Sequence, residues 1–155
     1  MPVTQVNATA AVEAVSAGSG LTIVASDLSE RIVLAQAPQD HPLAVAAHAT
    51  LAHLDAPEPD AVLTIRSAIP IASGMGSGAA VSTALIRALA EFLGQSLEPG
   101  EVSELVYHVE KIHHGTPSGI DNTVIAYEKP VYFVRESPIE TLTVGEPFTL
   151  LIADT

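Results

Sequence analysis

The sequence predicts an α+β fold with a mostly antiparallel sheet, and three observations lead to that class. Strand-like runs open the chain and suggest an antiparallel meander. Apolar residues at helical spacing then predict three helices in the middle of the chain. Four short strand-like runs close it. The length of 155 residues fits one domain or a piece of a larger protein.

The first three strands are expected at residues 2–15, 21–26 and 31–35. β-Branched residues are frequent in these runs, and a turn of small residues at 17–20 separates the first two. Further strands are expected at residues 61–66, 123–127, 131–134, 141–144 and 148–153.

The helices are expected at residues 42–54, 81–93 and 99–113, where apolar side chains recur at the spacing of one helix face. Asp40 is the candidate N-cap of the first helix, because its carboxylate can accept a bond from a first-turn N–H group. Gly94 is the candidate C-cap of the second helix.

Three histidines, His41, His48 and His53, lie on or beside the first expected helix. Their spacings of seven and five residues do not give the i, i+4 pair with which a helix grips zinc. We therefore expect solvated side chains there and no metal site.

Composition and charge exclude several classes of function. The chain has six basic and eighteen acidic residues and a net charge of −12, whereas nucleic acids and anionic membrane surfaces require basic patches. The absence of cysteine excludes disulfides and thiolate metal sites. No apolar run reaches the roughly 18 residues of a membrane-spanning helix, and no signal peptide is seen, so we expect a cytoplasmic protein.

A glycine-rich stretch at residues 70–80 is the first candidate site. Its glycines alternate with small residues where an expected strand gives way to an expected helix. Such a loop leaves backbone N–H groups available beside the positive end of a helix, so the stretch is a candidate phosphate cradle. The alternative is a turn without a ligand. The stretch lacks the Gly-Lys-Ser/Thr ending of a Walker A loop, and its glycine spacing does not fit a dinucleotide fingerprint.

A second stretch, residues 110–122, brings two carboxylates near a Pro-Ser-Gly turn. Asp121 follows that turn just before an expected strand, where it can accept a proton from a substrate hydroxyl. Glu110 lies on the preceding helix, where a carboxylate can hold Mg²⁺. Taken alone, the stretch can equally be a turn with a capping Asp. Together with the glycine cradle, the two carboxylates supply the parts that phosphoryl transfer needs.

These two stretches resemble motifs of the GHMP kinases. Residues 70–80 are similar to the family's phosphate loop, Pro-x-x-x-Gly-Leu-Gly-Ser-Ser-Ala-Ala. Residues 114–122 resemble the His-Gly-x-Pro-Ser-Gly-Ile/Val-Asp signature of the mevalonate kinases in that family. The resemblance covers nearly the whole chain and implies a sheet with helices packed on one face, as in the N-terminal domain of these kinases.

The resemblance also implies roles for individual residues. Asp121 matches the catalytic base toward the accepting hydroxyl, and Glu110 matches the Mg²⁺-binding glutamate. His114 and Ser118 lie on the substrate side of the signature turn. The loop around the ATP phosphates corresponds to Gly74, Met75, Gly76, Ser77, Gly78 and Ala79.

Two departures from the family pattern bear on these roles. The loop serine whose hydroxyl helps to bind Mg²⁺ is Gly78 here, so Ser77, one position earlier, is the candidate replacement. The family's first motif, a Gly-Lys strand followed by Gly-Glu-His, has no counterpart in the sequence. We therefore expect residues 1–147 to form an incomplete N-terminal domain and residues 148–155 to begin the C-terminal domain.

The function implied by the resemblance is ATP- and Mg²⁺-dependent phosphorylation of mevalonate at its primary hydroxyl, in isoprenoid biosynthesis. Another small-molecule kinase of the family, acting on phosphomevalonate or a sugar, is the nearest alternative. A non-catalytic truncated domain is the alternative from a different class, and the missing lysine motif favours it for this chain alone. The chain alone is therefore expected to be inactive and to self-associate, as a homodimer through an open sheet edge or as an aggregate.

Overall fold

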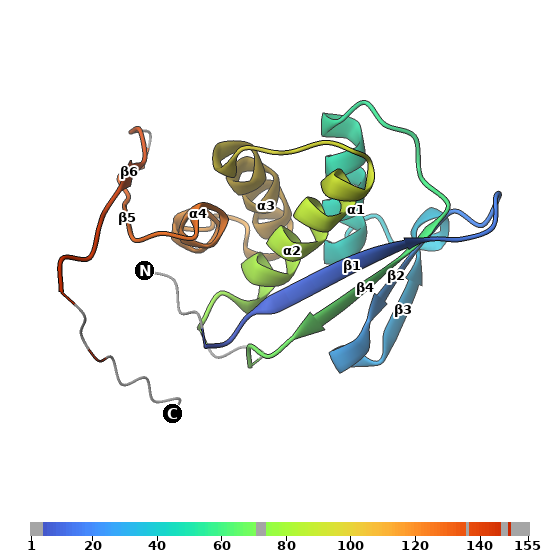
Figure 1. Cartoon of the computed structure of the whole chain (residues 1–155), viewed down its shortest axis with the longest axis horizontal. Helices are drawn as coiled ribbons and strands as arrows, with labels where there is room; N and C mark the ends of the chain where they lie inside the picture. Colours follow the sequence, from blue (N-terminus) through green and yellow to red (C-terminus); the bar gives the residue numbers. More distant parts are fainter. Residues whose placement is uncertain (1–4, 71–73, 136, 147–148, 150–155) are drawn as a thin grey trace.

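The structure is a computed structural model, and it describes residues 5–70, 74–135, 137–146 and 149. The side chains of residues 113 and 114 also lie outside the described part. A four-stranded sheet is covered by helices on one face, and a pair of very short strands follows (Figure 1). Within the described ranges, each helix is too short or too polar to cross a membrane.

The main sheet contains β1 (Ala8–Ala14), β2 (Leu21–Ala25), β3 (Glu30–Val33) and β4 (Ala61–Ser67), in the spatial order β1-β4-β2-β3. The pairs β1–β4 and β2–β3 are antiparallel, whereas β2 and β4 are parallel. The meander expected for the first three strands is therefore wrong, because β4 lies between β1 and β2. Every second residue of β1 is exposed, which suits an edge strand, whereas β4 is buried or half-buried over its first five residues, which suits the centre.

The first and third strands are shorter than the sequence predicts. The first begins at Ala8, and residues 1–4 lie outside the described part. The third ends at Val33, after which Leu34–Gln36 forms a 3₁₀ turn.

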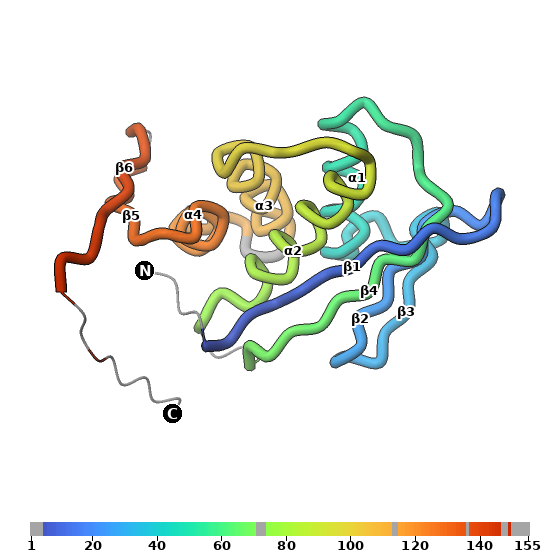
Figure 2. The backbone as a smooth tube through the Cα atoms, viewed as in Figure 1, coloured from blue at the N-terminus to red at the C-terminus, as the bar shows by residue number. Residues whose placement is uncertain are grey.

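Two short strands, β5 (Val131–Tyr132) and β6 (Glu140–Thr141), pair in antiparallel fashion over two residues each. They confirm part of the expected strands at 131–134 and 141–144. Figure 2 shows that the segment carrying them lies beside α4, on the side away from the main sheet. Most of the strand expected at 148–153 lies outside the described residues.

The helices are α1 (Pro42–His53), α2 (Ser77–Phe92), α3 (Pro99–His114) and α4 (Ile120–Tyr127). In Figure 1, α1, α2 and α3 lie on the same face of the sheet, and α4 lies next to α2 and α3. α2 follows β4 through the glycine-rich stretch and packs on β1 and β4. This arrangement confirms the α+β class with helices on one face.

The ends of the helices test two of the capping predictions. Gly94 directly follows the C-cap of α2 with a φ of 75°, so its expected role at the end of that helix is confirmed. Asp40 is not the N-cap of α1. His41 occupies that position without a side-chain cap bond, and Pro42 supplies a first-turn residue whose φ is already helical.

The strand expected at 123–127 is wrong, because this segment lies in the helix α4. Three β-branched residues in this run favour a strand in isolation. In the fold, however, Asn122 and Thr123 are buried and bond to Ser103 on α3. These tertiary contacts override the local preference.

The core lies between the helices and the sheet. Alternate side chains of β2 and β4 point into it, and α2 and α3 supply the opposing layer. The fully buried side chains include Leu21, Ile23, Leu63, Leu85, Ile86, Leu89, Val102 and Val106. Burying one such side chain contributes roughly 1.5–3 kcal/mol, so this layer fixes α2 and α3 relative to β4.

Candidate active site

The glycine-rich stretch forms the junction between β4 and α2, and residues 71–73 of it lie outside the described part. Gly74 and Gly76 have φ values of 72° and 69°, in the left-handed region that glycine adopts without strain. Gly76 is the N-cap of α2, which begins at Ser77. The first N–H groups of a helix have no intrahelical acceptor, so those of residues 77–79 are candidate anion-binding groups at the positive end of α2.

The candidate phosphate-binding residues differ in exposure. Gly74 and Gly78 are exposed, Met75, Gly76 and Ser77 are half-buried, and Ala79 is buried. The turn therefore offers its backbone to a ligand at the glycines, while Ala79 anchors it in the core.

Glu110 of α3 lies against the first turn of α2. A Cβ atom placed on Gly78 would be 3.2 Å from Glu110 Oε1, which is tighter than ordinary van der Waals contact. The glycine therefore lets a half-buried carboxylate approach the positive end of the helix. The fold thus brings together two residues that belong to different sequence motifs.

Asp121 lies in the first turn of α4, close to Gly76. A Cβ atom on Gly76 would be 3.4 Å from Asp121 Cγ and 3.1 Å from Ile125 Cδ1. The expectation that Asp121 precedes a strand is wrong, because the following residues continue α4. Its carboxylate is exposed and makes no hydrogen bond or ion pair with the described part of the chain, so it is available to a ligand.

Two cavities meet at Glu110. The larger, of about 640 Å³, begins at Ser77 and Gly78 and continues along apolar side chains of β2, β4 and α1. The smaller, of about 200 Å³, is lined by the Pro-Ser-Gly turn and Asp121. Glu110 lines both cavities, so it lies where a ligand on the glycine turn and a ligand beside Asp121 would meet.

The Pro-Ser-Gly turn is held by residues that follow α4. Arg135 Nη2 donates to Pro117 O at 3.0 Å. A Cβ atom on Gly119 would be 2.9 Å from Phe133 Cζ, so the aromatic ring packs directly on the glycine backbone. Gly119 has a φ of 86° and is the N-cap of α4. These contacts hold the turn that precedes α4, and so they position the first turn of α4, which carries Asp121.

Ser118 and His114 are the predicted substrate-side residues. Ser118 is exposed and lines the smaller cavity, and its Oγ accepts a bond from Ile120 N at 3.3 Å. His114 is the last residue of α3, and its side chain lies outside the described part. The structure therefore brings Ser118 next to Asp121, while the role of His114 stays a prediction.

The oxygen donors around Glu110 suit a hard cation. In the described part of the chain, no three His, Cys, Asp or Glu side chains group together as metal ligands. Mg²⁺ commonly binds through one or two carboxylates, with water and substrate phosphates completing its shell. Glu110, beside the glycine turn at the start of α2, fits that arrangement. Ser77 lines the same cavity, which keeps its hydroxyl as a candidate second ligand.

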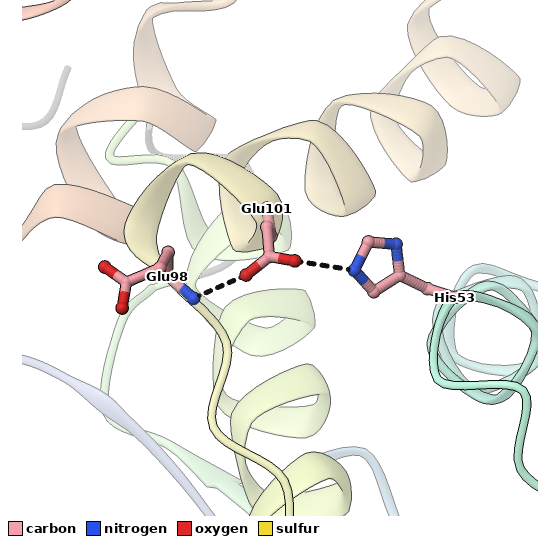
Figure 3. A network of polar contacts seen from close by, with 3 residues as sticks. All are labelled: His53, Glu98 and Glu101. Atoms are coloured by element: carbon pink, nitrogen blue, oxygen red, sulfur yellow. Dashed lines mark hydrogen bonds and ion pairs between the residues drawn. The ribbon is translucent and has the colours of Figure 1, made fainter.

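Two of the histidines near α1 bond to acidic side chains: His41 and Glu30 lie in the lining of the larger cavity, whereas the bond of His53 joins α1 to α3. His41 Nε2 lies 3.1 Å from Glu30 Oε1, and His41 is half-buried, so the expectation of a solvated side chain is wrong there. His53 Nε2 lies 3.0 Å from Glu101 Oε1 (Figure 3). The backbone N–H of Glu98 also donates to Glu101, and this bond, with a smaller contribution from His53, lowers the pKa of Glu101 from its ordinary value.

Sequence reasoning did not identify Arg135, Phe133 or Asn122 as parts of the site. A signal was available for the first two. The chain has only three Phe and six Lys or Arg residues, so an aromatic and a cation shortly after the signature turn stand out. Nothing in the sequence indicated that the Asn122 side chain would be buried.

The family comparison covers the centre of the chain. The model of the GHMP kinases N-terminal domain matches residues 40–129, a range that contains the glycine turn, Glu110 and Asp121. The mevalonate kinase of Thermococcus sibiricus is 42% identical over 84 residues, which are 54% of this chain and 25% of that protein. The mevalonate kinase of Arabidopsis thaliana is 36% identical over an alignment of 107 positions, and the match covers 61% of this chain and 28% of that protein.

The fold also matches solved structures. The crystal structure of the Methanococcus jannaschii mevalonate kinase superimposes with a TM-score of 0.77 at 22% identity, and the match covers 88% of this chain and 46% of that one. At this identity the likeness shows the fold alone. The chain spans about a quarter of the length of the two curated relatives and less than half of the solved kinase.

Proposed function

The chain belongs to the GHMP kinases, and from that premise we propose that its protein transfers the γ-phosphoryl group of ATP to the primary hydroxyl of mevalonate, a step in isoprenoid biosynthesis. The signature at residues 114–122 and the identity with mevalonate kinases support this acceptor. In this proposal residues 1–147 form the N-terminal domain of the kinase, and residues 148–155 begin the next one.

One observation supports the proposal most strongly: Glu110 lines both cavities, with the glycine turn on one side and Asp121 on the other. Phosphoryl transfer depends on positioning the phosphate donor, the metal and the acceptor together. The glycine turn offers a place for the phosphates, and the smaller cavity offers a place for the acceptor hydroxyl. Both reacting groups then meet beside Glu110.

Each candidate residue has a defined role in this arrangement. The N–H groups of residues 77–79 bind phosphate oxygens and, with the dipole of α2, offset their negative charge. Glu110 and Ser77 hold Mg²⁺, whose chemistry is to neutralise the charge that develops on the transferred group. Asp121 orients the acceptor hydroxyl and takes its proton on a carboxylate oxygen. Ser118 and His114 contact the substrate in the smaller cavity.

The apolar part of the larger cavity is the proposed place for the nucleoside. It extends from the glycine turn over Ile65, Leu43 and Ala25, where a purine ring would bury apolar surface. A volume of about 640 Å³ is typical of small-molecule sites. Because the chain is strongly acidic, the negative charge of the phosphates is offset by backbone N–H donors and Mg²⁺ more than by Lys or Arg side chains.

The test is a coupled ADP-release assay of the native protein with MgATP and a panel of acceptors. Turnover with mevalonate should exceed that with phosphomevalonate or sugars by at least roughly tenfold in kcat/KM. Preference for phosphomevalonate or a sugar would identify a different kinase of the family. Binding of MgATP without turnover of any acceptor would identify a non-catalytic domain.

A further inference from the structure

The position of Asp121 is set through its backbone. Its carboxylate is exposed and makes no hydrogen bond or ion pair within the described part of the chain. A general base must lie within hydrogen-bond reach of its proton donor, and a displacement of about 1 Å can cost on the order of 10²-fold in rate. The contacts that fix the first turn of α4 therefore fix the geometry of the proposed reaction.

A buried polar cluster joins this end of α4 to α3. It consists of Asn122, Thr123 and Ser103, whose side chains are only 5%, 3% and 8% exposed. Asn122 Nδ2 donates to Ser103 O at 3.0 Å and to Ser103 Oγ at 2.9 Å. Thr123 Oγ1 lies 3.3 Å from Ser103 Oγ and donates to Gly119 O at 2.6 Å. The cluster thus ties the start of α4 to the first half of α3.

The direction of each hydrogen bond in the cluster follows from its donors and acceptors. The hydroxyl hydrogen of Thr123 goes to Gly119 O, so Thr123 Oγ1 must accept the hydrogen of Ser103 Oγ. Ser103 Oγ in turn accepts from Asn122 Nδ2. Every hydrogen in this series has its own acceptor, and a satisfied buried network of this kind specifies one arrangement of the two helices.

The other end of α4 has a separate anchor. Arg87 of α2 donates through Nη2 to Ala126 O at 2.6 Å and forms an ion pair with Glu128. Loss of the polar cluster therefore loosens the attachment of this end of α4 to α3, where Arg135 and Phe133 still hold the preceding turn, while the opposite end stays attached to α2. A variant of the cluster can shift the carboxylate without detaching the helix.

We propose that Asn122 is a positioning residue, whose side-chain amide sets the distance between Asp121 and Glu110 in the proposed phosphoryl transfer. Glu110 lies two turns after Ser103 on α3, and Asp121 directly precedes Asn122 on α4. The amide thus clamps together the two helices that carry the two candidate site carboxylates. Asn122 also lines the smaller cavity, but its amide donates to Ser103, so in this proposal it acts on the reaction through the two helices and the backbone.

The test compares matched variants of the native protein. Asn122→Leu removes both N–H donors at similar volume, and Thr123→Val removes one hydroxyl at nearly constant shape. Thr50→Val is the control, because Thr50 is also fully buried and bonds to the carbonyl four residues before it, Ala46 O at 2.7 Å, but lies on α1. Thr123→Ser keeps the hydroxyl and serves as the rescue variant.

Asn122→Leu should lower kcat at least roughly tenfold and change the KM for MgATP by less than about twofold, because the amide affects alignment more than nucleotide binding. Thr123→Val should lower kcat by a smaller factor, and Thr123→Ser should restore it. Thr50→Val should lower the melting temperature and leave kcat unchanged. A kcat for Asn122→Leu equal to that of Thr50→Val would overturn the proposal.

A second measurement does not depend on activity. Because the chain has no cysteine, a nitroxide pair can be placed by Glu91→Cys on α2 and Ile120→Cys in the first turn of α4, both at exposed positions. Pulsed EPR should give a broadened or shifted distance distribution with Asn122→Leu and an unchanged one with Thr50→Val. An unchanged distance distribution with Asn122→Leu would overturn the positioning role of Asn122. Absence of kinase activity in the protein without these substitutions would overturn the proposed function alone.

Discussion

At the scale of single residues, two glycines let two carboxylates reach the end of α2. A Cβ atom on Gly78 would crowd Glu110 Oε1 at 3.2 Å, and one on Gly76 would crowd Ile125 Cδ1 at 3.1 Å and touch Asp121 Cγ at 3.4 Å. Bringing two carboxylates together is unfavourable in a chain of net charge −12 unless a positive field offsets their repulsion. The positive end of α2 supplies part of that field, and a bound cation would supply the rest.

The first prediction concerns Asp121, the proposed base. Asp121→Asn should lower kcat by at least roughly 10²-fold, because the amide cannot take the proton, while ATP affinity should change little. Folding should be preserved, since Gly119 and not Asp121 is the N-cap of α4. Steady-state kinetics and thermal unfolding measure both effects. Asp40→Asn, at an exposed position before α1, is the control, and near-normal kcat in Asp121→Asn would remove this residue from the mechanism.

The second prediction concerns Gly78. Gly78→Ser places a hydroxyl beside the Glu110 carboxylate and should tighten MgATP binding modestly, provided that the carboxylate gives way by a few tenths of an ångström. Gly78→Ala introduces the same Cβ without an oxygen, so it separates crowding from metal binding. Calorimetric titration of MgATP compares the variants. Equal affinities of the Ser and Ala variants would mean that an added hydroxyl does not reach the metal.

Part of this site could be predicted from the sequence because its residues lie in short continuous motifs. The glycine turn, Glu110 and Asp121 are of this kind, and the structure places them side by side. Ser103 could not be predicted, because a serine within a helix carries no signal of a buried partner from a later helix. Only the fold reveals that Asn122 bonds to it.

At the scale of elements, the local sequence pattern predicted the helices α1, α2 and α3 and the paired strands β2 and β3. It failed where tertiary contacts determine the secondary structure of a segment. Residues 120–127 form a helix, despite their β-branched side chains, because α3 offers partners for the polar ones. The position of β4 between β1 and β2 depends on long-range pairing with both strands, which the pattern of a single strand does not disclose. In this fold, the secondary-structure preference of a segment and its contacts with distant segments therefore act separately.

The third prediction concerns the start of α3, where Glu98 and Glu101 form a capping box that His53 extends. The pKa of Glu101 is lowered in the folded state, mainly by the bond from the Glu98 N–H. Its contribution to stability is therefore complete above the ordinary pKa of an unfolded glutamate and is lost as the pH falls through the lower folded pKa. Wild type should lose stability relative to Glu101→Gln as the pH falls from about 5 to about 3.

Urea unfolding at several pH values measures this difference. Glu104→Gln, an exposed glutamate on the same helix outside the capping box, controls for the loss of one negative charge. A free-energy difference between wild type and Glu101→Gln that does not vary with pH would contradict the assigned role.

At the scale of the whole molecule, a net charge of −12 opposes the approach of a polyphosphate. The fourth prediction is that removing Mg²⁺ with EDTA weakens ATP binding at least roughly tenfold, since backbone donors alone must then offset the charge. High monovalent salt should recover part of the metal-free affinity, because the screening length falls from about 10 Å at 0.1 M to about 3 Å at 1 M. Equal ATP affinities with and without Mg²⁺ at low salt would refute the metal's role.

The strand order has a consequence for how the chain folds as it is synthesised. The β2–β3 hairpin can pair as soon as it leaves the ribosome, but the partner of β1 among the described strands is β4, which is made later. At about 5–20 residues per second, that interval of some fifty residues lasts roughly 3–10 s. Emergence of β4 joins β1 to the β2–β3 pair in the described sheet, and the glycine turn follows β4 directly in the chain. Translation therefore delivers the glycine turn only after the strand that supports it.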